Sequence, residues 1–460
     1  MILKSIAEET LRTALATGGD FAELFWEDRR SGAVALIDGY IDDAATVRRH
    51  GAGIRIYRGL NSVYVHTNDT SLSGLKAAAQ KAADAMRGER MMGDVCLIQS
   101  IPLNRHAVRQ MPMDVKGTRK ARLLREVNQA AKSVSSEIAQ VRANLTCWES
   151  DVCIANSEGL FTGDRRVYTR LTVAAVAEGA GESQTGHVGP GALMGYELFE
   201  TRVNPEEAAH TAANMAVTML HADPCPAGVM PVVIDGGFGG VIFHEACGHS
   251  LEASSVAFGN SEFTGKLGQA IASPIVTAID DGTMPNEWGS GNIDDEGVPT
   301  TRLVLIENGI LKNYMVDRLN GRRMNLPSTG SGRRQDYTFA PTSRMRNTFI
   351  APGTHDEAEI IASCGDGLYA KSMGGGSVNP VTGEFNFAVD EGYLIRDGKI
   401  DRPVRGATLI GKGADILMKI DRVGKKMWMA QGMCGASSGS IPTNVGQPMI
   451  RVTDITVGGR

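Results

Sequence analysis

Two histidines and a glutamate form the densest group of reactive side chains in the sequence. The chain has only 9 histidines in 460 residues, yet His244, Glu245 and His249 fall within one short segment. A neutral imidazole is a standard nitrogen ligand of zinc, and a neighbouring glutamate can accept a proton from a zinc-bound water. The pattern His-Glu-x-x-x-His therefore predicts a Zn²⁺ site in which His244 and His249 are ligands and Glu245 is the general base.

The two histidines stand one residue further apart than in the common zinc-peptidase pattern, which places them at positions i and i+4. At 3.6 residues per turn, positions i and i+5 lie about 140° apart around a regular helix, so both rings cannot face one ion. A π-helical turn would bring the rings together, and such turns are frequent at functional sites. We expect a kinked or locally widened helix at Cys247–Gly248, with Gly248 permitting the distortion.

Zinc requires a third protein ligand, and two cysteines qualify. Cys247 lies three residues after His244 and shares its face on a regular helix. Cys434 lies far along the chain in a segment rich in glycine and serine, where a thiol is exposed and ionisable. The spacing leaves both open. The seven cysteines include no Cys-x-x-Cys pair, which indicates reduced thiols and no disulfide framework.

Three further segments have more than one interpretation. The run Gly237–Gly240 lacks the third glycine and the βαβ context of a dinucleotide fingerprint, so we expect no nucleotide cofactor and a close approach of the helix start to neighbouring backbone. Arg333 and Arg334 either contact a substrate carboxylate or hold neighbouring acidic side chains. Gly374–Gly376 either expose backbone to a bound peptide or form a tight loop. The sequence assigns no substrate-binding residue.

The elements that must position these residues divide the chain in two. Residues 1–222 show helix, strands and helix twice, which predicts an α/β domain with mixed or antiparallel sheets, a weak internal duplication and an irregular connection over 87–117. Asp223–Gly228 is typical of a linker. Residues 226–460 predict a β-rich, mainly antiparallel domain with one kinked metal-binding helix, because Asn308-Gly309 and Asp397-Gly398 are typical hairpin turns. The predicted class is α+β.

Composition excludes several kinds of partner. The formal net charge is −5, the isoelectric point is about 6.0 and aromatic residues make up 5% of the chain, so we expect no nucleic-acid partner. No apolar stretch approaches about 18 residues, so we expect no membrane span. The first segment carries Glu8 and Glu9 where a signal peptide needs an apolar core, which predicts a cytoplasmic protein.

The segment Val233–Ala253 closely resembles the signature of the TldD/PmbA (TldD/TldE) family. The resemblance covers most of residues 226–460 and extends more loosely to Gly51–Tyr64 and Asn156–Gly159. The other segments that carry it are Asp294–Thr300, Thr329–Arg334, Arg344–Thr348, Gly374–Gly376, Pro403–Gly411, Gly446–Pro448 and Thr456–Gly459.

This resemblance implies a zinc metallopeptidase of the catalytic TldD type. The family's third ligand maps onto Cys434 and not onto Cys247, and one departure follows it, since relatives often have Gly-Lys where this chain has Gly435-Ala436. The family implies hydrolysis of short or unfolded peptides by glutamate-assisted attack of a zinc-bound water, in a homodimer or a heterodimer with a TldE-like subunit. The alternative is a non-catalytic peptide-binding or assembly subunit of such a complex, whose structural zinc Cys247 would close as fourth ligand.

Overall fold

Long antiparallel strands dominate the first half of the chain. The computed structural model describes residues 2–86, 88, 95–379 and 381–459, and its first sheet has the order β3-β2-β1-β5-β6-β4, with β7 and β8 also paired to β6. Only β4 is parallel to its neighbour. The strands are β1 (Phe21–Ile37), β2 (Tyr40–Arg58), β3 (Asn61–Thr67), β4 (Ile98–Gln99), β5 (Ile138–Asn156), β6 (Leu160–Gly179), β7 (Glu182–Val188) and β8 (Gly191–Ala192).

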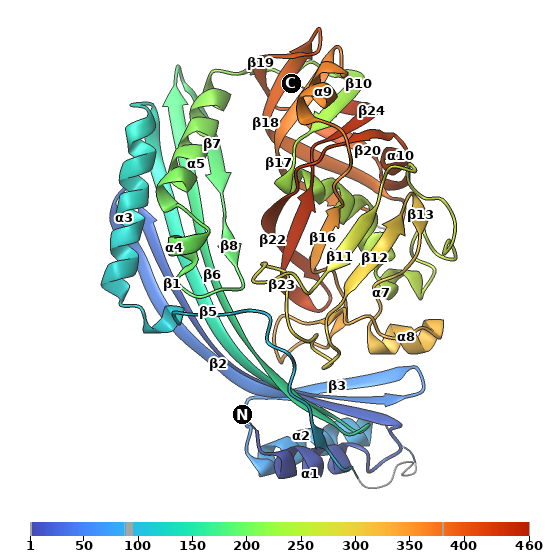
Figure 1. Ribbon diagram of the computed structural model, residues 1–460. Coiled ribbons are helices and arrows are strands. Elements are labelled where there is room, and N and C mark those ends of the chain that lie inside the picture. The colour runs from blue at the N-terminus through green and yellow to red at the C-terminus, as the bar shows by residue number, and fades with distance from the viewer. Residues whose placement is uncertain (1, 87, 89–94, 380, 460) are drawn as a thin grey trace.

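Helices cover this sheet at its two ends (Figure 1). At one end α1 (Lys4–Ala14) and α2 (Leu72–Met86) bury an alanine- and leucine-rich face against β1, β2 and β3. At the other end α3 (Gly117–Val134) and α5 (Pro205–Leu220) do the same against β5 and β6. Short α4 (Leu198–Thr201) and η1 (Pro112–Asp114) complete this half. Both runs of helix, strands and helix thus join one sheet, and their internal duplication stays a prediction.

The strands are longer than the sequence indicates. The residue pattern indicates separate strands at 21–28 and 33–37, whereas β1 pairs continuously with β5 through the polar stretch between them. Charged side chains are accommodated there by cross-strand ion pairs: Asp28 with Arg48 at 2.8 Å and Arg30 with Glu149 at 3.3 Å. Of the predicted irregular connection over 87–117, residues 87 and 89–94 lie outside the described residues, and the remainder contains β4 and η1.

Two further sheets build the second half of the chain. One has the order β17-β10-β24-β20-β18-β19-β9, with β21 paired to β24; because β17 also pairs with β18, five of its strands close into a ring. The other has the order β13-β12-β11-β16-β23-β22, which leaves β22 at its edge. The predicted linker at Asp223–Gly228 is partly wrong, since β9 (Asp223–Pro224) joins the sheet beside β19.

The bounds of these strands are β10 (Gly228–Ile234), β11 (Ala278–Asp281), β12 (Arg302–Glu307), β13 (Ile310–Leu311), β16 (Asn347–Ile350), β17 (Gly367–Val378), β18 (Glu384–Arg396), β19 (Lys399–Arg405), β20 (Thr408–Lys412), β21 (Ile420–Val423), β22 (Trp428–Ala436), β23 (Gly439–Gln447) and β24 (Ile450–Gly458). A separate pair is formed by β14 (Gly332–Arg333) and β15 (Thr342–Ser343). The peripheral helices are α8 (Arg318–Met324), α9 (Glu357–Ala362) and α10 (Gly413–Met418).

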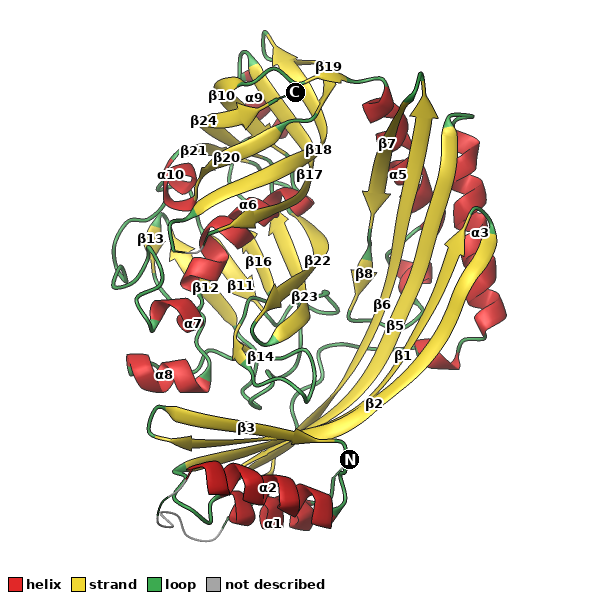
Figure 2. Cartoon of the chain, turned by 180° about the vertical axis from the view of Figure 1, so that it is seen from behind, coloured by secondary structure: helices red, strands yellow, loops and turns green. Residues whose placement is uncertain are grey.

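One buried helical segment runs between these two sheets (Figure 2). It follows β10 directly and consists of η2 (Gly237–Gly240), α6 (Val241–Phe243), the π-helical turn η3 (His244–Gly248), η4 (His249–Leu251) and α7 (Ala253–Val256). Its apolar side chains belong to the largest hydrophobic cluster of the molecule, together with side chains of both sheets. The helix is therefore held from both sides along the stretch that carries the histidines.

The predicted fold class is confirmed: the protein is α+β with a β-rich second half. Both predicted hairpins are present, and their turns place Asn308, Gly309, Asp397 and Gly398 at positive φ, as two-residue turns require. Among the described residues, no helix combines the length and apolar character needed to cross a membrane.

Candidate metal centre

The predicted widened turn lies at the two histidines. His244–Gly248 form a single π-helical turn, which adds one residue to the turn and brings positions i and i+5 towards the same side. The predicted role of Gly248 is different from the observed one. Its φ of −54° and ψ of −52° are ordinary helical values, so no special backbone freedom is used. Instead, a Cβ at Gly248 would overlap the sulfur of Met345, so the glycine permits close packing.

The glycine run before the helix also allows two segments of backbone to pack closely, as expected. A Cβ at Gly240 would lie 2.6 Å from the backbone nitrogen and oxygen of Gly446 on β23. The start of the helix therefore lies directly against β23, the strand that pairs with β22. This contact fixes the distance between the helix and the hairpin that carries Cys434.

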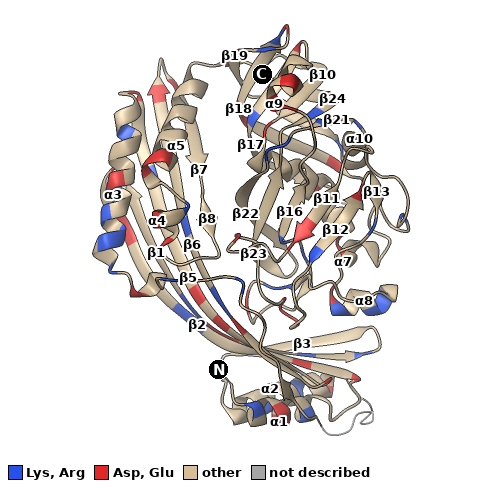
Figure 3. Ribbon diagram, in the orientation of Figure 1, with Lys and Arg blue, Asp and Glu red and all other residues tan. Residues whose placement is uncertain are grey.

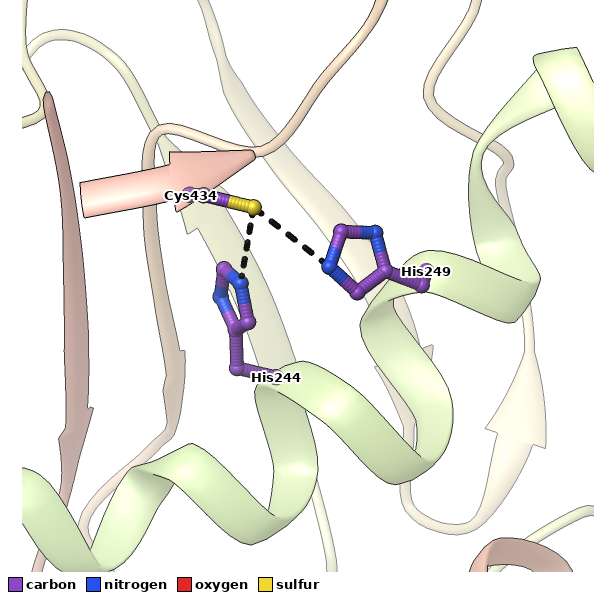
Figure 4. A group of neighbouring side chains, drawn as sticks. All are labelled: His244, His249 and Cys434. Atoms are coloured by element: carbon purple, nitrogen blue, oxygen red, sulfur yellow. Dashed lines mark hydrogen bonds between the residues drawn. The ribbon is translucent and has the colours of Figure 1, made fainter. Parts of the chain in front are cut away.

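Cys434 meets both histidines (Figure 4). Its Sγ lies 3.4 Å from Nε2 of His244 and 3.4 Å from Nε2 of His249. The three ligand atoms all lie within 4.8 Å of one another, and this is the one such group of His, Cys, Asp and Glu side chains found among the described residues. Cys247, the local alternative, is fully buried and lies outside this group. Of the two cysteines left open by spacing, the fold brings the distant one to the histidines.

The separations suit a zinc ion. With a Zn–S bond of about 2.3 Å and Zn–N bonds of about 2.0–2.1 Å, tetrahedral coordination requires a sulfur-to-nitrogen separation of about 3.5 Å. Both observed separations are 3.4 Å. Two imidazoles and one thiolate also form a mixed nitrogen and sulfur donor set that zinc accepts.

The electrostatics favour the thiolate. The expected exposure of the Cys434 thiol is wrong, because the side chain is buried between the helix and the hairpin. Burial opposes charge on Cys434, but hydrogen bonds and positive charge from the two imidazoles lower its pKa to about 4. The opposite effect acts on His249: burial opposes the imidazolium, yet Glu252 and the thiolate raise its pKa well above the ordinary value. Cys147, Cys153 and Cys247 show the contrast, because burial raises the pKa of each. A thiolate is the form of cysteine that binds a metal.

Two glutamates contact the outer side of this group. Glu245 keeps 26% of its side chain exposed, and its Oε2 lies 3.6 Å from Nε2 of His249, beside the ligand atoms. Glu252 is buried, and its Oε2 lies 3.1 Å from Nδ1 of the same ring. That bond places the proton of a neutral imidazole on Nδ1 and leaves Nε2 free to bind a metal. Sequence reasoning missed Glu252, although its position three residues after His249 on a helical segment was a usable signal.

The hairpin of Cys434 is held by a buried arginine. Arg344 donates from Nη2 to the carbonyl of Cys434 at 2.5 Å, and from Nη1 to Ser438 and Gly439 in the turn, at 2.9 Å each. The side chain of Arg344 is fully buried. Since β22 is an edge strand that pairs with β23 on one side, these hydrogen bonds from Arg344 supply the support for the Cys434 position that a second neighbouring strand would otherwise give.

The segments with two interpretations are resolved differently. Arg334 is buried and donates to Glu23 at 2.6 Å, so it holds a neighbouring acid. Arg333 is equally buried but donates to the backbone carbonyls of Met345 and Pro442. Gly374–Gly376 belong to β17 at an irregularity in its register with β18: Gly376 pairs with Phe387, whereas Gly374 and Gly375 have no partner in the ladder. Exposed backbone at Gly375 is therefore compatible with the first interpretation, and a tight loop is not observed.

Comparison with known proteins agrees with this geometry. The fold and site define a protein in which a widened helix and an edge strand bring two imidazoles and a thiol together. Family models described as domain 1, the central domain and the C-terminal domain of the PmbA/TldA metallopeptidases match residues 22–85, 112–220 and 227–459. The chain belongs to this family, PmbA/TldD, as the sequence motifs predicted.

Individual relatives match along nearly the whole chain. A protein named metalloprotease TldD homolog from Haemophilus influenzae is 35% identical over 452 residues, which are 96% of this chain and 93% of that protein. A protein named metalloprotease from Methanothermobacter thermautotrophicus is 32% identical over 441 residues, 96% of each chain. The crystal structure of TldE from Thermococcus kodakarensis shares the fold, with a TM-score of 0.78 at 18% identity, over 99% of this chain and 100% of that one.

Proposed function

We propose that this protein is a zinc peptidase that hydrolyses short or unfolded peptides. The observation that carries the proposal is the convergence of His244, His249 and Cys434, from one widened helix and one distant edge strand, at separations that suit tetrahedral zinc. The names of the relatives support a metal-dependent protease. Zinc bound by these three side chains supplies Lewis acidity towards a peptide carbonyl and lowers the pKa of water.

Glu245 is proposed as the general base. Its carboxylate lies beside the ligand atoms and stays partly exposed, so it can reach both water and substrate. It would take a proton at Oε2 from the attacking water and pass it to the departing amine. Glu252 would act indirectly by holding the ring of His249 in one orientation.

The peptide is proposed to bind along β22. A groove of about 950 Å³ lies between the first sheet with α5 on one side and β17 and β22 on the other. Met429–Met433, five consecutive residues of β22, line it, and among the described strands β22 pairs only with β23. The carbonyls of Gln431 and Gly432 already accept from Arg170 and Trp288, at 2.9 and 2.8 Å. An extended peptide can add to this edge through its remaining backbone groups, which suits cleavage with little sequence preference. The groove ends at Met433, next to Cys434.

Mutation of Glu245 tests the catalytic proposal. We expect Glu245→Ala to bind zinc as the wild type does but to cleave an unfolded peptide at least about 100-fold more slowly. A variant that keeps both zinc and full activity would refute the role of Glu245. Zinc binding without cleavage by the wild type would instead favour the non-catalytic assembly subunit.

We infer that the working unit contains two subunits, either two copies of this chain or this chain with a TldE-like protein. The likeness to TldE supports a partner of the same fold. Sedimentation of the purified chain, compared with the protein isolated from its source cell with its partners, separates the two assemblies. A monomer in both preparations would contradict the inference.

A further inference from the structure

A polar cavity lies where the first sheet meets the hairpin of Cys434. Its volume is about 70 Å³, and its walls come from β1, β5 and β6 on one side and from β22, β23 and nearby loops on the other. Met433 and Pro442 of the hairpin pair directly, on the face opposite to Cys434 and Ile441. None of His244, His249 and Cys434 lines the cavity, so it is distinct from the metal centre, although the same two strands border both.

Arginine is the dominant side chain of this cavity. Two carboxylates, Glu27 and Asp295, also line it. Figure 3 shows acidic and basic residues on the strands of the first sheet, where these strands approach the loops of the second half. The five arginines of the lining are Arg29, Arg166, Arg333, Arg334 and Arg346.

Two of the five arginines are neutralised by acids. Arg166 donates to Asp295 at 2.5 Å, and Arg334 pairs with Glu23 at 2.6 Å. Glu27, the other carboxylate of the lining, accepts from the hydroxyl of Ser150 at 2.7 Å and from the backbone of Tyr337 at 3.2 Å. Burial raises the pKa of Glu27 above its ordinary value.

The guanidinium groups of the other three arginines have no carboxylate oxygen within 4.0 Å in the described part of the chain. Arg333 donates only to two carbonyls. Arg346 donates from Nε to the carbonyl of Gly330 at 3.2 Å. Nε of Arg29 has no hydrogen-bond partner among the described residues, and its guanidinium group lies over the ring of Trp148, 4.7 Å from the ring centre. Burial and the charge of Arg346 lower the pKa of Arg333 to about 9.

We propose that this cavity binds one small oxyanion, a carboxylate or a phosphate, through Arg29, Arg333 and Arg346. Arg333 and Arg346 are buried and Arg29 is partly buried, and no carboxylate pairs directly with their guanidinium groups. Burying positive charge without a direct ion pair is costly, and an anion between the three side chains would lower that cost. The planar guanidinium group matches the paired oxygens of a carboxylate or phosphate. A volume of about 70 Å³ accommodates a few waters or one such anion.

The bound anion would join the two halves of the molecule. Arg29 belongs to the first sheet, whereas Arg333 and Arg346 belong to the second half. Arg333 also donates to Pro442 of the Cys434 hairpin at 2.7 Å, so the anion would hold the hairpin through Arg333. The proposal concerns the protein with or without metal and does not depend on peptidase activity.

Titration calorimetry on the full chain tests this proposal. Inorganic phosphate, acetate and a short peptide with a free carboxyl end are compared at constant ionic strength in chloride, together with the same peptide as its amide. We expect saturable binding of one phosphate, weakened at least about tenfold in Arg29→Gln and in Arg333→Met and unchanged in Arg122→Gln, an exposed arginine of α3. Binding of the free peptide but not of its amide would identify a peptide carboxyl end as the source of the oxyanion. Preference for phosphate would identify a free ion as the source.

Two results would overturn the proposal. One is the absence of saturable binding of any of these oxyanions to the wild type. The other is equal binding by the wild type and Arg29→Gln. Nε of Arg29 has no hydrogen-bond partner among the described residues and its guanidinium group forms no ion pair there, so Arg29→Gln keeps the test valid if Arg333→Met fails to fold.

Discussion

Replacement of Glu252 by glutamine isolates the effect of one buried charge on the metal centre. In the protein, Oε2 of Glu252 lies 3.1 Å from Nδ1 of His249, while Oε1 accepts from the backbone nitrogen of Met345 at 3.3 Å. Glutamine keeps the shape but has one acceptor oxygen for these two donors. One N–H group would therefore face the amide nitrogen, and His249 would lose its negatively charged partner.

The expected loss is a weakening of zinc binding by about 10- to 100-fold, the usual effect of removing the partner of a metal-binding histidine. This corresponds to about 1.4–2.7 kcal/mol of binding free energy. Competition with a chromophoric chelator measures the dissociation constant directly, and circular dichroism checks that the variant is folded. Glu307→Gln, an exposed change in the turn after β12, is the matched control. A folded Glu252→Gln protein with the zinc affinity of the wild type would refute the reasoning.

Three further predictions concern the ligand, the helix and a buried carboxyl group. Cys434→Ser should lose zinc binding whereas Cys247→Ser should keep it, as metal analysis after dialysis will show. The reverse pattern would show that Cys247, and not Cys434, is the ligand. Gly248→Ala should lower the free energy of unfolding by about 1–3 kcal/mol in urea, because the added methyl group overlaps Met345, whereas Gly435→Ala, with open space around it, should not. Burial raises the pKa of Glu296 above its ordinary value of 4.5. Between pH 4.5 and the raised pKa, the folded state therefore holds a proton that the unfolded state releases. Its contribution to stability is therefore present below pH 4.5 and lost as pH rises through the raised pKa; Glu296→Gln should flatten this part of the pH–stability curve, and an unchanged curve would contradict the assignment.

Local signals predicted the hairpins and the widened helix. Asn308-Gly309 and Asp397-Gly398 supply positive φ whatever surrounds them, so their turns follow from the residues alone. The i and i+5 spacing of His244 and His249 likewise requires a wider turn if both are to reach one ion. The length of β1 could not be predicted, because the polar residues after Asp28 are typical of a turn. Their partners on β2 and β5 are distant in sequence.

The third ligand and the arginine cavity depend on tertiary structure in the same way. The residue pattern left Cys247 and Cys434 open, since nothing local shows that β22 ends at the helix; family resemblance supplied the choice. Two roles were open for the pair Arg333 and Arg334, and the fold assigns different partners to the two neighbours. Arg334 reaches Glu23, which lies 311 residues away, while Arg333 meets no acid in the described structure.

The separation of the ligands along the chain has a consequence for biosynthesis. Cys434 follows His244 by 190 residues. At about 5–20 residues per second, a ribosome needs about 10–40 seconds to add this segment. During that interval the nascent chain presents two imidazoles without their thiolate, and a truncated product never acquires it. A protease assembled from this site would thus remain inert until the segment that carries Cys434 has been translated, which protects the emerging polypeptide and its neighbours from premature cleavage.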